Sequence, residues 1–105
     1  MFFKNDRHKE MYQRLSALVP ENREYDTATY VLSAIGKAQI AEYVGDGISI
    51  DAIMQNMDLS SGEVALAKIA GNLFNGRECD LQEIAKLDEN NMLVVLEAIK
   101  MRYLN

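Results

Sequence analysis

The stretch SSGEVALAKIAGNLFNG, residues 60–76, most constrains the fold of this chain. Ser60 and Glu63 have the spacing of a capping box, in which each side chain accepts a hydrogen bond from a backbone amide at the start of a helix. Gly76 stands where a helix favours a left-handed residue just beyond its end. Between these signals the residues are mostly apolar or small. Because a helix that is apolar on nearly every side is buried, we expect a central buried helix at residues 60–76.

Helix signals recur along the rest of the chain, and no pair of strands is expected. Cap-forming residues such as Asn5 and Asp26 precede segments with apolar side chains at helical spacing, and Gly-Asp-Gly predicts a sharp turn at residues 45–47. These patterns predict further helices over residues 5–19, 26–35, 37–44, 49–57, 81–87 and 88–105. A chain of 105 residues, 49% of them hydrophobic, is the size and composition of one globular domain. We therefore predict an all-α fold, in which residues 1–105 form a compact single-domain bundle of about six short helices around residues 60–76.

The charge balance indicates which classes of partner the chain disfavours. With 11 basic and 16 acidic side chains the formal net charge is -5, which opposes binding to nucleic acid or to an anionic membrane surface. No apolar run is long enough to span a bilayer, and charged residues directly follow Phe2 and Phe3, so no signal peptide is indicated. Cys79 is the single cysteine, which excludes an internal disulfide and fits a reducing compartment. We expect a cytoplasmic protein that does not bind membrane and for which nucleic acid is a disfavoured partner.

The residue types that carry out catalysis are sparse. His8 is the only histidine and lies in a hydrophilic segment, so we expect it to be a solvated surface group. Cys79 has no histidine near it in the sequence, and the flanking Arg77 and Glu78 would shift its pKa in opposite directions, so we expect a partly buried, unreactive thiol. One histidine and one cysteine cannot form a zinc site, and no calcium loop or glycine-rich phosphate loop is present. We predict no catalytic residue, no metal site and no cofactor, and hence a protein that is not an enzyme.

Residues 50–69 have the spacing of a helix-turn-helix, which leaves DNA binding as the alternative function. Ile53 and Met57 would fill buried positions of the first helix, and Val64 would anchor the second. Base and phosphate contacts require basic or amide side chains, however, and Lys68 is the only basic residue on the second helix. Two helices that meet across a tight turn are also a common packing unit. We therefore rank a DNA-binding regulator below a protein-binding module.

Four segments carry a family resemblance. They are FKNDRHKEMY near the N-terminus, DTATYVLSAIG, IAGNLFNG at 69–76 and EAIKMRY at 97–103. Together and in this order they resemble a family of small, uncharacterised all-helical proteins from Gram-positive bacteria and their phages and prophages. The polar KLDENNM departs from the family, which often has an aromatic stretch at that place. Because the family has no established activity, the resemblance implies a phage or mobile-element setting in a bacterium and no mechanism.

A non-enzymatic module that binds another protein or itself is the leading hypothesis, because the chain is acidic, rich in apolar residues and poor in catalytic groups. The core-facing side of the last helix is predicted to consist of Met92, Val95, Leu96 and Ile99. Leu93, Val94 and Met101 then lie on other faces, where a monomer would expose them unless the short helix at 81–87 covers them. We predict that these three residues form the self-association surface of a homodimer.

Overall fold

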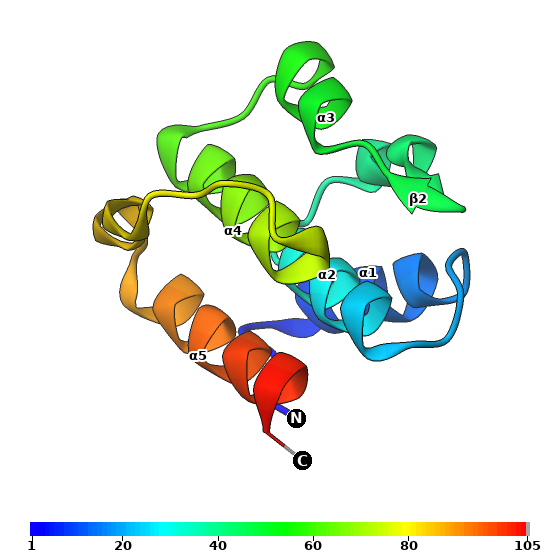
Figure 1. The fold of residues 1–105 in the computed structure, drawn as a ribbon, viewed down its shortest axis with the longest axis horizontal. Coiled ribbons are helices and arrows are strands. Elements are labelled where there is room, and N and C mark those ends of the chain that lie inside the picture. The colour runs from blue at the N-terminus through cyan, green and yellow to red at the C-terminus, as the bar shows by residue number, and fades with distance from the viewer. Residues whose placement is uncertain (105) are drawn as a thin grey trace.

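The structure is a computed structural model that describes residues 1–104, shown as a ribbon in Figure 1. The elements are α1 (Asp6–Ser16), α2 (Arg23–Ser33), η1 (Ala38–Tyr43), β1 (Val44–Gly45), β2 (Gly47–Ile48), α3 (Ile50–Asn56), α4 (Ser61–Asn75), η2 (Leu81–Lys86) and α5 (Glu89–Tyr103). The predicted compact all-α fold is confirmed, with seven helices among the described residues. The predicted helices at 37–44 and 81–87 are the 3-10 helices η1 and η2. In the described part of the chain no helix has the length and apolar character needed to cross a membrane.

Helix α2 lies at the centre of the bundle. Every residue from 27 to 35 is buried, and α2 packs against α1, α4 and α5. In Figure 1 it runs behind α4, between the other long helices. Helix α4 is buried, with an apolar or small side chain at each of its buried positions, but α2, and not the predicted residues 60–76, is the most completely buried helix. The core of the domain therefore forms around a pair of packed helices, α2 and α4.

The burial of α2 depends on how its polar side chains are satisfied. Thr27, Thr29 and Ser33 are fully buried. The hydroxyl of Thr27 donates to the Arg23 carbonyl at 2.8 Å, and that of Ser33 donates to the Tyr30 carbonyl at 2.6 Å. Because a buried hydroxyl lowers stability only when it lacks a hydrogen-bond partner, burying these residues costs little stability. A segment of mixed polarity can therefore serve as the central helix.

Both ends of α4 have the predicted geometry. The Ser60 hydroxyl accepts a hydrogen bond from the Glu63 amide at 3.2 Å, and the Glu63 carboxylate accepts one from the Ser60 amide at 2.9 Å. Gly76 closes the helix with a φ of 79°, in the left-handed region. Within the helix, a Cβ at Gly71 would lie 3.1 Å from Ile50 Cγ1, so the absence of a side chain lets α3 approach α4 closely. The capping box and the glycines fix the length and packing of this helix.

Helix α2 begins earlier than predicted. The predicted N-cap was Asp26, but the helix starts at Arg23. The Asn22 side chain accepts a hydrogen bond from the Tyr25 amide at 2.9 Å and thereby caps the helix. Both residues have side chains that suit a cap, and the earlier one prevails because it adds a further turn of backbone hydrogen bonds.

Candidate functional site

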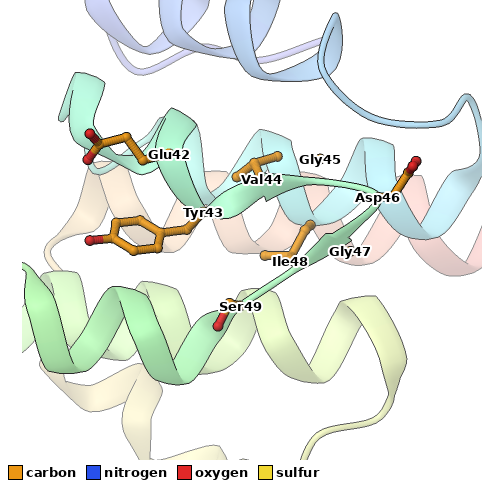
Figure 2. Close-up of a pocket in the computed structure, with 8 residues that line it drawn as sticks. All are labelled: Glu42, Tyr43, Val44, Gly45, Asp46, Gly47, Ile48 and Ser49. Carbon is orange, nitrogen blue, oxygen red and sulfur yellow. The ribbon is translucent and has the colours of Figure 1, made fainter.

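A short hairpin interrupts the helical bundle and forms a shallow hollow, which Figure 2 shows. No strand pair was predicted, but Val44 pairs with Ile48 across the predicted turn, where Gly47 has a φ of 116°. In Figure 2 the carboxylates of Glu42 and Asp46 lie at opposite ends of the hairpin, with Val44 and Ile48 between them. The acidic groups do not converge. These two carboxylates therefore do not form a common metal site.

His8 is fully buried, so the prediction of a solvated surface group was wrong. Its Nδ1 accepts a hydrogen bond from the Lys4 amide at 3.2 Å, and its Nε2 donates to the Tyr30 carbonyl at 2.9 Å. The Phe3 ring stacks edge-on against the imidazole at a centroid distance of 5.1 Å. Burial lowers the pKa of His8, which keeps the ring neutral. Both ring nitrogens are hydrogen-bonded, so His8 links Lys4 to α2 and has no nitrogen left for catalysis.

The buried carboxylate Glu83 and the thiol Cys79 also have structural surroundings. Glu83 lies 2.9 Å from Lys68 Nζ and 2.8 Å from Lys86 Nζ, and hydrogen bonds from Lys86 and Lys68 hold its pKa below the ordinary value. This pairing joins η2 to α4. Cys79 is partly buried, as predicted, and burial raises the pKa of its thiol. In residues 1–104 no three histidine, cysteine or acidic side chains gather where they could hold a metal ion.

Residues 50–69 form two helices joined by a turn, as a helix-turn-helix requires, but η2 covers the outer side of α4. A Cβ at Gly62 would lie 3.3 Å from a backbone carbonyl of η2. Lys68, the basic residue of this helix, is engaged in its ion pair with η2. Of the residues of α4, all of which the structure describes, only Ser61 and Asn75 are exposed. Helix α4 thus presents no free basic face of the kind that enters a DNA groove.

The outer face of α5 is the main apolar feature of the surface. Four large side chains are exposed along this helix, at 41% for Leu93, 49% for Leu96, 40% for Ile99 and 59% for Tyr103. We call these four residues the α5 stripe. In Figure 1 α5 forms one edge of the bundle, and the exposure of the four side chains shows that the other helices do not cover the stripe.

Helix α5 is rotated relative to the predicted orientation. Leu96 and Ile99, predicted to face the core, are exposed, whereas Val94, predicted to be part of a self-association surface, is fully buried. Met101, the third residue of that surface, is partly buried against the core, so only Leu93 lies where it was expected. The helix packs against both α2 and α4, and its short side chains are buried there: Val94, Val95 and Ala98. Short side chains allow a closer approach of the helices, which directs the leucines outward.

Apolar residues from other elements widen the α5 stripe on both sides. Phe2 lines one hollow together with Leu93 and Leu96. On the other side Ile99 and Leu81 line a cleft of about 100 Å³ between α4, η2 and α5. Leu81, the first residue of η2, is 79% exposed. An apolar surface therefore continues from Phe2 across α5 to Leu81, and it is the candidate functional site.

Comparisons with protein-family models, curated proteins and solved structures find no match for this chain. The family resemblance carried by the four sequence segments therefore stays a prediction.

A sequence signal for the stripe does exist. Leu93, Leu96, Ile99 and Tyr103 follow one another at intervals of three, three and four residues, which places them on one face of a helix. Residues 92–96 are apolar without interruption, so the sequence allows several choices of buried face, and the observed face differs from the predicted one. Packing against two helices, which the sequence of α5 does not reveal, decides between them.

Proposed function

We propose that this protein is a non-enzymatic protein–protein interaction module whose binding surface is the α5 stripe. The observation that supports this most is the alignment of four large exposed apolar side chains along one helix. Contiguous apolar patches on a small domain are typical of surfaces that bind other proteins. The stripe also has a rigid base, because the opposite side of α5 is packed into the core, and a rigid surface loses little conformational freedom on binding.

The surroundings of the ionisable groups support a role without catalysis. His8 and Glu83 link neighbouring elements through their hydrogen bonds and ion pairs, and Cys79 packs against the core. DNA binding through residues 50–69 is less well supported, because the net charge is -5 and η2 covers the outer side of α4. The family resemblance implies a bacterial or phage setting, and a small interaction module fits that setting.

Site-specific photo-crosslinking in cells tests this proposal. A photoreactive amino acid is placed at Leu96 and, as a matched control, at Gln55, an exposed position on α3 at the far end of the molecule in Figure 1. We expect a protein adduct from position 96 that is missing from position 55. Mass spectrometry identifies the partner, and its binding to the purified protein should be lost with Leu96→Lys and kept with Gln55→Lys. Equal adducts from both positions, or none, would contradict the proposal.

A further inference from the structure

Two opposite charges lie in line with the leucines of the α5 stripe. Glu89 and Lys100 are exposed, and among residues 1–104 neither takes part in an ion pair. Glu89, Leu93, Leu96 and Lys100 are separated by four, three and four residues. At about 100° per residue this spacing places all four within about 60° of arc on one side of the helix. The helix thus presents an acid, two leucines and a base in one row.

The intervals in this row, four, three and four residues, are the same whether the row is read from Glu89 or from Lys100. If a second α5 lies antiparallel to the first, with the twofold axis between the levels of Val94 and Val95, Leu93 lies opposite Leu96 of the second copy. In the same register Glu89 lies opposite Lys100, and the symmetry repeats both pairs. An antiparallel coiled-coil contact brings together positions of this kind. A single register therefore pairs the leucines with each other and pairs each acidic side chain with a basic one.

We infer that the partner of the α5 stripe is a second copy of this chain, docked by antiparallel pairing of the two α5 helices. The inference rests on the proposed function, since it assigns an occupant to the same surface. Charge complementarity favours this arrangement over a parallel one, in which Glu89 would face Glu89 and Lys100 would face Lys100. The apolar contact supplies affinity, and the charges set direction and register.

The expected strength follows from the size of the contact. Helix α5 has 15 residues, which corresponds to a length of about 22 Å. Two such helices, widened by Phe2 and Leu81, make an interface at the small end of the range for specific complexes. We expect a dissociation constant on the order of micromolar, so the protein exchanges between monomer and dimer at ordinary concentrations.

Analytical ultracentrifugation of charge variants tests the pairing. The wild type should form a concentration-dependent dimer between about 1 and 100 µM, and Leu96→Lys should be monomeric. Glu89→Lys and Lys100→Glu should each weaken the dimer about tenfold, because each places like charges at both ends of the contact. The double variant Glu89→Lys/Lys100→Glu should regain wild-type affinity. An equal mixture of the two single variants should form a heterodimer for the same reason.

The double variant also separates pairing from helix stability. Glu89 in the first turn and Lys100 in the last turn both interact favourably with the helix dipole, so each single change also weakens the helix. If that effect caused the loss of dimer, the double variant would be the weakest of all. Asn90→Lys, which adds a positive charge at the same helix end but outside the row, should dimerise like the wild type. Circular dichroism verifies that every variant is folded.

Three outcomes would overturn the inference: a wild type that stays monomeric at about 100 µM, a double variant weaker than either single variant, or single variants that dimerise like the wild type. A monomer whose position 96 still crosslinks to another protein would leave the proposed function standing and reject self-pairing. A monomer without any crosslink would reject both.

Discussion

Helices α2 and α5 reverse the usual relation between polarity and burial. Helix α2 contains Thr27, Thr29 and Ser33, yet these residues are fully buried. Helix α5 contains four large apolar side chains that are between 40% and 59% exposed. The difference shows that hydropathy alone does not decide what is buried in this domain. A side chain is buried when neighbouring elements cover it and its polar atoms find partners.

The partners available to α2 come from its own backbone and from the N-terminal segment. The last carbonyls of a helix lack partners within it, and near this end the Tyr30 carbonyl accepts hydrogen bonds from His8 Nε2 and the Ser33 hydroxyl. The Tyr30 hydroxyl in turn donates to the Phe2 carbonyl. Helix α5 has no comparable cover on its outer face, where Phe2 reaches only one margin of the stripe. Phe2 and His8 thus complete the burial of α2, whereas most of the outer face of α5 stays uncovered.

The largest expected difference between the two helices is in the cost of truncating a leucine. Leu32 of α2 is fully buried, and Leu96 of α5 is 49% exposed. Leu32→Ala should lower the free energy of unfolding by about 2–5 kcal/mol, because it leaves a cavity in the core. Leu96→Ala should lower it by less than about 1 kcal/mol. Urea denaturation at a concentration where the protein is monomeric measures both, and similar losses for the two variants would contradict the comparison.

The parts of the fold that were predicted correctly depend on local signals. The capping box of Ser60 and Glu63, the left-handed Gly76 and the turn at residues 45–47 each involve residues a few positions apart. The physical cause of each structure lies within its own segment, so the sequence of that segment is enough to predict it. The number of helices follows from the same kind of signal.

The parts that were not predicted depend on contacts between distant segments. His8 lies in a hydrophilic segment, and its burial requires Phe3 to fold back over it and the Tyr30 carbonyl to meet it. The outward face of α5 depends on which of the apolar residues 92–96 meet α2 and α4. Val94 and Leu96 are both apolar, so their own sequence does not show that one is buried and the other exposed. The sequence therefore indicates exposed apolar residues on α5 but does not show which face of the helix they occupy.

The second prediction concerns the pH dependence of stability, which we expect to depend on His8 and its hydrogen bond to α2. Burial lowers the pKa of His8 from its ordinary value of 6.5. The unfolded chain therefore binds a proton more readily than the folded one, and stability is lost as the pH falls from about 6.5 toward the lower pKa of the folded state. The loss should reach at most about 1.4 kcal/mol per pH unit, the value for one proton. Urea denaturation between pH 7 and pH 5 measures it.

His8→Gln is the matched control for this measurement, because glutamine can donate a hydrogen bond but does not titrate. The variant should be less stable at pH 7 and should show a weaker dependence on pH. Asp26 contributes in the opposite direction, since burial raises its pKa, but it is common to both proteins. The difference between the two pH profiles therefore isolates His8. Parallel profiles would show that His8 titrates alike in the folded and unfolded states.

The smallest expected effect tests how α2 tolerates its polar residues. The Thr29 hydroxyl donates to the Tyr25 carbonyl at 2.8 Å and lies 3.2 Å from the Asp26 carbonyl. Because a carbonyl within a helix also accepts a backbone amide, removal of the hydroxyl should leave no polar group without a partner. Thr29→Val keeps the branched shape and should change the free energy of unfolding by less than about 1 kcal/mol. Thr29→Ser keeps the hydroxyl but loses a methyl group, which costs about 1 kcal/mol in a packed core.

The relative stability of these two variants shows which property of Thr29 keeps α2 at the centre of the bundle, its shape or its hydroxyl. If Thr29→Val is at least as stable as Thr29→Ser, the shape of the side chain matters more than its hydroxyl, and the threonines of α2 act as core residues whose polarity is satisfied locally. A loss above about 2 kcal/mol for Thr29→Val, in the range of a buried group left without a partner, would contradict this. The hydroxyl would then contribute to the fold beyond its own helix, and the contrast between α2 and α5 would need a different explanation.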